Sequence, residues 1–289
     1  MKRRRFLHIA AAAALSGLPE VGAAEVVWRG RGFGADLSLT LTGPGDRATV
    51  LAALPRLIAA IEAEFSLYDP ASTLSRLNAG ERVSVSPALR ALLDWSAVLH
   101  RVTAGAFDPT VQVLWQKGLG GRAAPIGLAR LDLTARTLRL PAGMALTFNG
   151  IAQGYAADAV RGLLATHGFA EALVDMGEFA ALGGPYRLGL ADPLAGLLAE
   201  RQLTGGAMAT SSPFATTLAG QPHIRHPRGL APRWSTVSIE ADQALMADGL
   251  STAAVFLSRA ELGALLPRLP GLRRITTVDF DGNLSSLTA

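Results

Sequence analysis

The hydrophobic residues of this sequence follow two different spacings, and this mixture is the strongest constraint on the fold. Leu37, Leu39 and Leu41 alternate with polar residues, which is the pattern of a β-strand. From Asp46 to the turn at 68–70, apolar residues recur every three or four positions, which predicts a helix disturbed at Pro55. Because such segments follow one another without regular strand–helix–strand alternation, we expect an α+β fold and not a doubly wound parallel sheet.

Further segments of both kinds follow along the chain. Ser86 and Pro87 predict the start of a second helix that ends at Gly105. The same spacing predicts helices over 151–167 and 242–257. Short strands are expected at 172–176, 187–190, 199–203, 207–211 and 275–280, the last of them before a turn at 281–283.

The glycines that precede the first strand do not form a dinucleotide-binding loop. Gly30, Gly32 and Gly34 have a suggestive spacing. A loop of that kind follows a strand and opens a helix, whereas here the order is reversed. We therefore do not expect a Rossmann-type site.

The composition is typical of one compact globular body. Of the 289 residues, 49% are hydrophobic and 17% are charged, which is enough to form a core. The chain has no cysteine, which excludes disulfides, thiolate metal sites and a lipoprotein anchor. The net charge is +4, but residues 1–24 carry +3 of it, so little supports nucleic-acid binding by the remainder.

The first 24 residues have the pattern of an export signal. A basic start is followed by an apolar stretch over 6–18 and by small residues at 21–24. The run from Arg3 to Leu7 fits the twin-arginine pattern R-R-x-F-L, and an ordinary secretory signal is the alternative. We expect residues 1–24 to be a twin-arginine-type signal peptide, and residues 25–289 to be one soluble periplasmic domain.

A late segment carries oxygen ligands on one helix face. Asp248 and Thr252 are four residues apart within a predicted helix, so they project from one side, and Ser251 lies beside them. Carboxylate and hydroxyl oxygens suit Mg²⁺ or Ca²⁺. Taken alone, the same residues also fit a helix cap or a solvated face.

Other segments carry single candidates for chemistry. His223 and His226 precede Pro227, and a loop histidine can be a base, a phosphate contact, a metal ligand or none of these. Residues 147–155 form a glycine-containing helix start, which favours an anion. Phe107 could lie against a ring system and Asp108 could accept a hydrogen bond, although 103–109 also fits a simple turn. A hydroxyl-rich strand end lies at 209–212.

Seven short blocks, taken in order, resemble the ApbE family of FAD:protein FMN transferases. The resemblance covers essentially all of the chain after the signal. The blocks are FSLYDP to LSRLN at 65–78, GAFDPT at 105–110, NGIAQGYAAD at 149–158, VDMGE at 174–178, ATS at 209–211, HIRHP at 223–227 and ADGLST at 247–252.

The resemblance implies a fold and a reaction. The fold would be a single ApbE-like (T-fold-like) domain with mixed antiparallel sheets and packed helices. The reaction would be Mg²⁺-dependent transfer of FMN from FAD to a threonine hydroxyl of a target flavoprotein, with release of AMP. By similarity, Asp248, Ser251 and Thr252 would hold the metal together with the Gly150 carbonyl. Asp248 and His223 would be catalytic, His223 by assisting proton removal from the threonine.

The resemblance also implies a set of flavin contacts. The residues at the matching positions are Phe33, Tyr68, Ala106, Phe107, Asp108, Thr147, Gln153 and Ile224. The sequence departs from the family pattern at several places near ligand contacts. Thr147 replaces an aspartate, Gln153 replaces a lysine, and His226 replaces an aspartate or asparagine. A threonine usual after Pro227-Arg228 is missing, and Met176 replaces a glycine.

The implied partner is the envelope-facing domain of a membrane redox flavoprotein that carries the acceptor threonine, with nitrous oxide reductase and ion-pumping systems as candidates. Two other functions remain open at this point. One is an FAD-binding carrier or assembly chaperone that performs no transfer. The other is an FAD pyrophosphatase in which water replaces the threonine.

Overall fold

The computed structural model describes residues 26–115, 125–218 and 220–289. The export signal predicted for residues 1–24 lies outside these ranges. Within them, no helix combines the length and the apolar character needed to cross a membrane.

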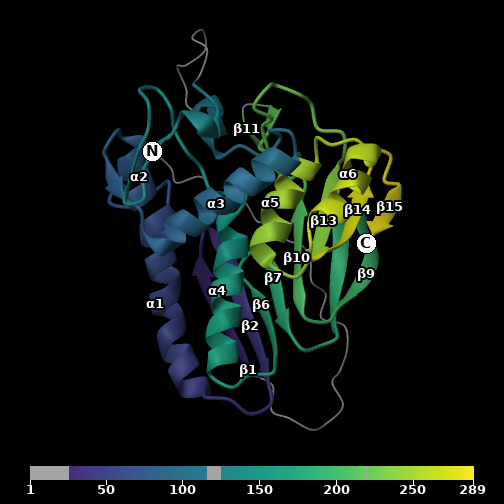
Figure 1. Ribbon diagram of the computed structural model, residues 1–289. Coiled ribbons are helices and arrows are strands. Elements are labelled where there is room, and N and C mark those ends of the chain that lie inside the picture. Colours follow the sequence, from purple (N-terminus) through teal and green to yellow (C-terminus); the bar gives the residue numbers. More distant parts are fainter. Residues whose placement is uncertain (1–25, 116–124, 219) are drawn as a thin grey trace.

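An antiparallel sheet of eight strands forms the centre of the protein (Figure 1). Every pair of neighbouring strands in it is antiparallel. In spatial order the strands are β1 (Val26–Gly32), β2 (Ala35–Thr42), β6 (Glu171–Asp175), β7 (Phe179–Leu182), β10 (Gly206–Ser211), β13 (Thr236–Ala241), β14 (Leu272–Val278) and β15 (Leu284–Thr288).

Helices cover one face of this sheet. In Figure 1, α1 (Arg47–Phe65), α4 (Ala152–Thr166) and α5 (Ala244–Ala254) lie side by side in front of the strands. The other helices are α2 (Thr73–Asn78), α3 (Pro87–Val102) and α6 (Arg259–Leu265), with 3₁₀ turns η1 (Pro109–Trp115), η2 (Leu128–Arg130) and η3 (Leu266–Arg268).

The opposite face is covered by the hairpin of β8 (Tyr186–Asp192) and β9 (Gly196–Leu203). Alternation along β6 shows the two sides. Ala172 and Val174 belong to the core beneath the helices, whereas Leu173 packs with Leu188 of the hairpin. Successive side chains of a strand point to opposite faces, so this sheet is buried on both sides in its middle.

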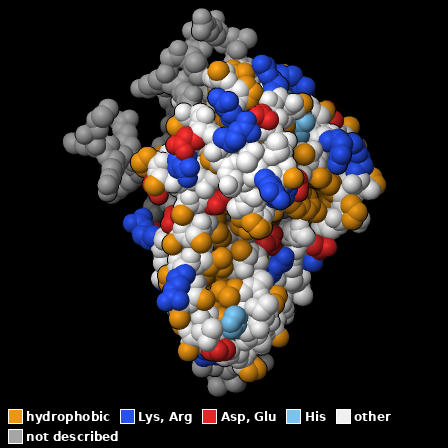
Figure 2. Space-filling view, turned by 60° about the vertical axis from the view of Figure 1, so that its left-hand side comes forward, with side chains coloured by type: hydrophobic (Ala, Val, Ile, Leu, Met, Phe, Trp, Pro, Cys, Tyr) orange, Lys and Arg blue, Asp and Glu red, His pale blue; other side chains and the backbone are white. Residues whose placement is uncertain are grey.

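Smaller strands complete the fold. They are β3 (Val83–Ser84), β4 (Asp132–Leu133), β5 (Thr137–Arg139), β11 (Thr217–Leu218) and β12 (Gln221–Pro222). On the face shown in Figure 2, basic and acidic side chains are interspersed and do not gather in one patch.

The structure confirms the α+β class and most predicted elements. Asp46 and Ser86 cap α1 and α3 through hydrogen bonds to backbone amides, as expected for these residue types. Pro55 lies inside α1 and does not end it, so the predicted disturbance is at most local. Pro55 is exposed, so the carbonyl that loses its usual amide partner can bind water.

The predicted strand at 275–280 is wrong at its end and is not the last strand. β14 stops at Val278, and Asp279 accepts hydrogen bonds from the backbone N–H groups of Asp281 and Asn283. These bonds reverse the chain into β15, which the sequence reasoning missed.

Candidate functional site

The predicted metal ligands from two distant segments lie together where the start of α4 meets α5. The Gly154 N–H donates to Asp248 Oδ2 at 2.9 Å. Thr252 Oγ1 lies 3.5 Å from the Gly150 carbonyl oxygen, to which it donates. The helical spacing of Asp248 and Thr252 therefore presents both oxygens to the 150–154 segment.

Two glycines make this approach possible. A Cβ atom at Gly154 would overlap with the Ala244 carbonyl oxygen, and one at Gly150 would lie 2.7 Å from Thr252 Oγ1. A side chain at Gly154 would push α4 away from the α5 backbone, whereas one at Gly150 would displace the Thr252 side chain. Gly154 is thus required by the contact between α4 and α5, and Gly150 by the position of Thr252.

Ser251 takes a different direction. Its hydroxyl donates to the Asp248 carbonyl at 2.9 Å and lies 2.8 Å from Ser211 Oγ at the end of β10. It is fully buried. Ser251 therefore ties α5 to the hydroxyl-rich strand end at 209–212.

A second carboxylate lies close to Asp248. Asp248 is 3% exposed and Glu178 is 6% exposed. Burial raises the pKa of Asp248 to about 7, although the Gly154 N–H opposes this. Burial also raises the pKa of Glu178 well above its ordinary value, and the charges of Asp248 and Asp175 raise it further. The Thr210 N–H, which donates to Glu178 Oε2 at 3.1 Å, acts in the other direction.

This charge arrangement fits a divalent cation that is bound together with substrate. No ion pair of the described residues involves Asp248 or Glu178, so the nearby negative charge is uncompensated by Lys or Arg. The described residues also contain no cluster of three or more His, Cys, Asp or Glu side chains that could enclose a metal. Mg²⁺ is usually held by one or two carboxylates plus waters and substrate phosphates, so the oxygens of Asp248, Thr252 and Gly150 suit it.

His223 is held in a tautomer suited to a base. Its N–H donates to the Pro213 carbonyl, and its ring Nδ1 lies 3.2 Å from the Thr216 carbonyl. A carbonyl only accepts, so Nδ1 carries the proton and Nε2 is unprotonated in the neutral ring. Burial lowers the pKa of His223, which favours that neutral form.

His226, which replaces an aspartate or asparagine of the family pattern, forms a turn that an aspartate could also form. His226 Nδ1 accepts the Arg228 N–H at 3.0 Å, as a carboxylate oxygen two residues earlier would. Its buried ring packs edge-on against Phe256 at 5.0 Å. Arg228 in turn donates to the Ala104 carbonyl at 3.3 Å, which joins the 223–228 loop to the segment before Phe107.

The predicted flavin contacts at 106–108 are almost fully buried. Asp108 Oδ1 accepts both the N–H and the hydroxyl of Thr110, and Oδ2 lies 3.4 Å from His100 Nδ1. His100 Nδ1 is also 3.0 Å from the Phe107 carbonyl. The Asp108 carboxylate therefore holds the loop in shape.

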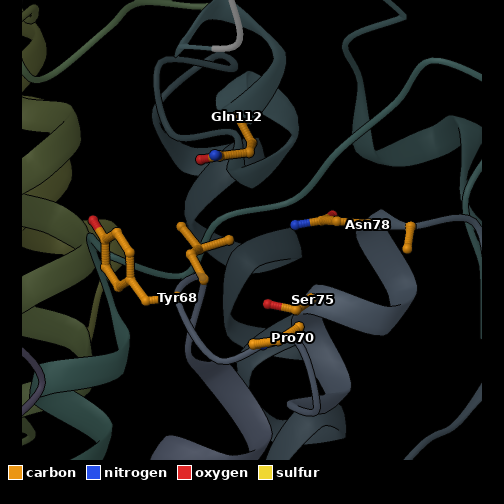
Figure 3. A pocket seen from close by; sticks show the side chains of 7 residues that line it. Tyr68, Pro70, Ser75, Asn78 and Gln112 are labelled. Carbon is orange, nitrogen blue, oxygen red and sulfur yellow. The ribbon is translucent and has the colours of Figure 1, made fainter. Parts of the chain in front are cut away.

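A cavity of about 540 Å³ opens beside Tyr68 (Figure 3). Tyr68 is 69% exposed, and its side chain forms one side of the cavity. Asn78, on the wall, donates to the Leu146 carbonyl at 2.8 Å and accepts the Leu146 N–H at 2.7 Å. Because Thr147 comes next and its N–H donates to the Pro109 carbonyl, the cavity wall is joined to both the 147–150 and the 106–110 segments.

Phe33 and Gln153 lie near the turn between β6 and β7. The turn that carries Phe33 follows β1, and the β2–β6 register places it at the same end of the sheet as Gly177. Gly177 has a φ of +93°, and a Cβ atom there would overlap with the Gln153 amide. Phe33 itself has a φ of +52°, and its N–H donates to Glu62 at 2.8 Å.

The predicted site residues, all of which are described, thus fall into contacting groups. Hydrogen bonds connect Gly150 with α5, Thr147 with Pro109, and the His223 loop with both 213–216 and 104. Ile224 is half-buried and packs against the main core. Tyr68 is the one predicted residue on the cavity wall.

Several residues with a place in this region were not predicted as site residues. Glu178, Ser211 and Asn78 lie inside the seven blocks, so the blocks themselves were the available signal. Gln112, which also lines the cavity, lies outside every block. His100 also lies outside them, and no spacing in the sequence marks it.

Comparisons with known proteins agree with this fold. The sequence model of the ApbE family matches residues 33–275. The flavin transferase ApbE from Vibrio cholerae has a TM-score of 0.79 and 21% identity, over 93% of this chain and 98% of that chain. The ApbE protein from Thermotoga maritima has a TM-score of 0.79 and 23% identity, over 91% and 96%. The apo form of the Pseudomonas stutzeri flavinyl transferase ApbE has a TM-score of 0.76 and 23% identity, over 92% and 95%. None of the curated proteins compared matches by sequence.

Proposed function

Because the chain belongs to the ApbE family, we propose that it transfers the FMN part of FAD to a threonine hydroxyl of an acceptor flavoprotein and releases AMP in a Mg²⁺-dependent step. The observation that carries this proposal is that Asp248 contacts the Gly154 N–H and Thr252 contacts the Gly150 carbonyl, so that two segments about a hundred residues apart in the sequence meet here. The names of the Vibrio and Pseudomonas structures, flavin transferase and flavinyl transferase, support the same reaction.

Of the four predicted ligands, Asp248, Thr252 and the Gly150 carbonyl would hold the metal, and the Gly154 N–H would orient the Asp248 carboxylate. The Ser251 hydroxyl, which is bonded to Ser211 and to the Asp248 carbonyl, would join them only by giving up one of these bonds. When bound, Mg²⁺ supplies positive charge that offsets the negative charge developing on the pyrophosphate. Burial and the charge of Asp248 raise the pKa of Glu178, and a cation bound nearby would favour its ionised form, in which it would add negative charge to this region.

His223 would assist the acceptor. The threonine oxygen forms a bond to the phosphorus of the FMN phosphate, and the bond from that phosphorus to the oxygen bridging to AMP breaks. His223 Nε2 takes the hydroxyl proton as this happens, while the hydrogen bond from Nδ1 to the Thr216 carbonyl keeps the ring in the required tautomer. Positioned bases of this kind contribute a rate factor of roughly 10²–10⁴.

The cavity beside Tyr68 would receive the flat flavin ring. Its volume of about 540 Å³ lies within the range of roughly 300–1,000 Å³ that is usual for small-molecule pockets. The Asn78–Leu146 bonds place its wall next to Thr147, three residues before Gly150. A dinucleotide seated here could extend its phosphates toward α5.

We also propose that residues 1–24 direct twin-arginine export and that the protein acts in the periplasm. The support is the sequence pattern from Arg3 to Leu7. The acceptor would be an envelope-facing domain of a membrane redox flavoprotein, because such a domain shares that compartment.

One assay tests the reaction. The protein is incubated with FAD, Mg²⁺ and a purified flavin-acceptor domain encoded by a neighbouring gene, and the mass of the domain and the amount of AMP are measured. The proposal predicts that the domain gains one FMN unit for each AMP released and that EDTA stops both. AMP with free FMN and an unlabelled domain would instead show a pyrophosphatase, and intact bound FAD would show a carrier.

A further inference from the structure

The cavity beside Tyr68 contains a polar side chain with unused hydrogen-bonding capacity. The Asn78 carboxamide is hydrogen-bonded to Leu146 through both its nitrogen and its oxygen, and the Ser75 hydroxyl donates to the Ser66 carbonyl. The Gln112 carboxamide, on the same wall, makes no hydrogen bond with any residue that the structure describes. Figure 3 shows it extending toward the side of the cavity where the Tyr68 ring lies.

Gln112 is carried by an element that is fixed at both ends. At the start of η1, Thr110 is bound to Asp108, and its hydroxyl accepts the Gly127 N–H at 2.7 Å. At its end, the Arg225 guanidinium lies over the Trp115 ring at 5.8 Å. Residues three apart in a 3₁₀ helix lie on one side, so the Trp115 contact steadies the side that carries Gln112.

Part of the remaining wall is apolar. Leu67, Pro70 and Ala79 contribute to it, and Pro70 lies on the opposite side from Gln112 in Figure 3. The cavity therefore offers a ring platform, apolar contacts and two carboxamides, of which that of Asn78 is already bonded to Leu146 and that of Gln112 is bonded to no described residue. A ligand that matches it is flat, apolar at one end and able to donate and accept hydrogen bonds at the other.

The isoalloxazine ring has this distribution. Its dimethylbenzene end is apolar, and its pyrimidine edge presents an N3–H donor between two carbonyl acceptors. A carboxamide complements that edge by accepting from N3–H and donating to a neighbouring carbonyl. Adenine also pairs with a carboxamide, but it has no comparable apolar end.

We propose that Gln112 is a specificity-determining residue that recognises the pyrimidine edge of the flavin, with Oε1 accepting from N3–H and Nε2–H donating to the adjacent carbonyl. The inference rests on the proposed function, because it takes FAD as the substrate. It assigns a role to a residue that lies outside all seven sequence blocks.

The test compares binding of FAD and of N3-methyl-FAD, which lacks the N3–H donor. Dissociation constants are measured by flavin fluorescence, without acceptor, for the wild-type protein and for Gln112→Ala, whose shorter side chain leaves room for the methyl group. We expect the wild type to bind N3-methyl-FAD about 10-fold more weakly than FAD, and Gln112→Ala to bind the two within about 2-fold. Because the ratio is taken within each protein, a change in the folded fraction cancels.

Two further variants control the comparison. Gln112→Glu keeps an acceptor for N3–H and should keep most of the preference for FAD over N3-methyl-FAD. Gln202→Ala removes an exposed carboxamide on β9 and should keep the wild-type ratio. A tenfold preference retained by Gln112→Ala would overturn the proposal, as would no preference in the wild type. The proposal would also be overturned if N6-dimethylation of the adenine weakened FAD binding in the wild type but not in Gln112→Ala, because Gln112 would then recognise the adenine.

The outcome is separable from that of the transfer assay. Edge recognition without labelling of an acceptor would overturn FMN transfer and leave the role of Gln112 standing. Labelling with no discrimination at N3 would overturn the role of Gln112 alone. Failure of the wild type to bind FAD would overturn both.

Discussion

Asp248 combines three features in one side chain. It is almost fully buried, it accepts a backbone N–H from the start of another helix, and it lies near a second buried carboxylate. Burial of a carboxylate without a cationic partner is costly, and proteins tolerate it mainly where the charge has a function. At His223, a single contact fixes the neutral tautomer: the Thr216 carbonyl accepts the hydrogen bond from Nδ1.

Replacement of Asp248 by asparagine should abolish Mg²⁺-dependent transfer. The asparagine oxygen can still accept the Gly154 N–H, but the negative charge that holds the cation is lost. We expect AMP release to fall by about 100-fold or more at saturating FAD, a loss typical of removing a key electrostatic group. Asp94→Asn, which changes an exposed carboxylate on α3, is the matched control and should leave the rate unchanged. A rate for Asp248→Asn within a few-fold of wild type would remove Asp248 from the metal site.

The His223 assignment predicts a pH profile. Burial lowers the pKa of His223 from its ordinary value of 6.5, so the basic form persists to lower pH than in a free histidine. At saturating Mg²⁺, which keeps Asp248 ionised, the wild-type rate should therefore fall on the acid side with a midpoint below 6.5. His223→Gln should be slower by roughly 10²–10⁴ and should lose this acid limb while FAD affinity stays the same. An unchanged acid limb in the variant would show that another group is the base.

At the scale of elements, the site depends on how closely α4 and α5 approach. Gly154 lets the Ala244 carbonyl and the Asp248 side chain pack directly on the α4 backbone. Asp158 of α4 also accepts the N–H groups of Ala244 and Leu245, so it caps α5 from outside the helix. The two helices therefore position the Gly150 carbonyl and the Thr252 hydroxyl as one unit.

Gly154→Ala should disturb both stability and activity. The added methyl group has no space beside the Ala244 carbonyl, and forced overpacking costs about 1–3 kcal/mol. We expect a lower Tm. We also expect Mg²⁺ to bind less tightly, so that transfer needs a higher Mg²⁺ concentration. Gly162→Ala is the control, because nothing lies within 4 Å of its added Cβ in the same helix. It should stabilise the protein by about 0.5–1 kcal/mol. Equal effects of the two substitutions would contradict the close-packing argument.

Sequence patterns predicted elements well where burial is one-sided and poorly where it is not. The alternation of Leu37, Leu39 and Leu41 marked β2, and the side chains of Asp46 and Ser86 marked two helix starts. Strands β7 and β13 were missed because they are buried on both faces and show no alternation. Strand β1 was missed because its glycines and arginines do not read as a strand.

The site could be predicted only in part for a related reason. Asp248 and Thr252 share a helix face, which spacing reveals, but the approach of Gly150 is a tertiary contact and was expected from family resemblance alone. The electrostatic coupling of Glu178 to Asp248 acts across the fold and leaves no local pattern. The role of His226 Nδ1 as a turn acceptor was hidden because histidine is not a usual turn residue.

For the whole molecule, the buried carboxyl groups should connect stability with pH and metal. The folded-state pKa of Asp248 is raised to about 7, above the unfolded value of 3.8, so the folded protein binds the extra proton between these values. That contribution to stability is present at low pH and is lost as pH rises through this window. Burial raises the pKa values of Glu178 and Asp175 too, so both groups also make the folded state less stable as pH rises.

Asp248→Asn should therefore stabilise the metal-free protein more at pH 8 than at pH 5. The neutral side chain avoids the buried charge, and the opposing effects of His223 and His226 cancel in the difference between variant and wild type. We expect the difference in Tm to grow by about 3 °C or more between the two pH values in EDTA. Mg²⁺ at pH 8 should raise the Tm of the wild type and should leave the Tm of Asp248→Asn unchanged. A Tm difference that is independent of pH would contradict the raised pKa of Asp248.

Export is the other prediction for the whole chain. Arg3→Lys combined with Arg4→Lys keeps the charge of the signal but breaks the twin-arginine pattern. We expect the double variant to accumulate uncleaved in the cytoplasm, as followed by fractionation and by the mass of the mature chain. Normal export of this variant would favour the ordinary secretory route.

The most direct test of the account is the position of the divalent cation relative to FAD. Crystals grown with FAD and Mn²⁺ in place of Mg²⁺ would locate the metal by its anomalous scattering. We expect a peak within coordination distance of Asp248, Thr252 Oγ1 and the Gly150 carbonyl oxygen, with an FAD phosphate oxygen as a further ligand. Bound FAD with no peak there, or with the metal held by other residues, would contradict it.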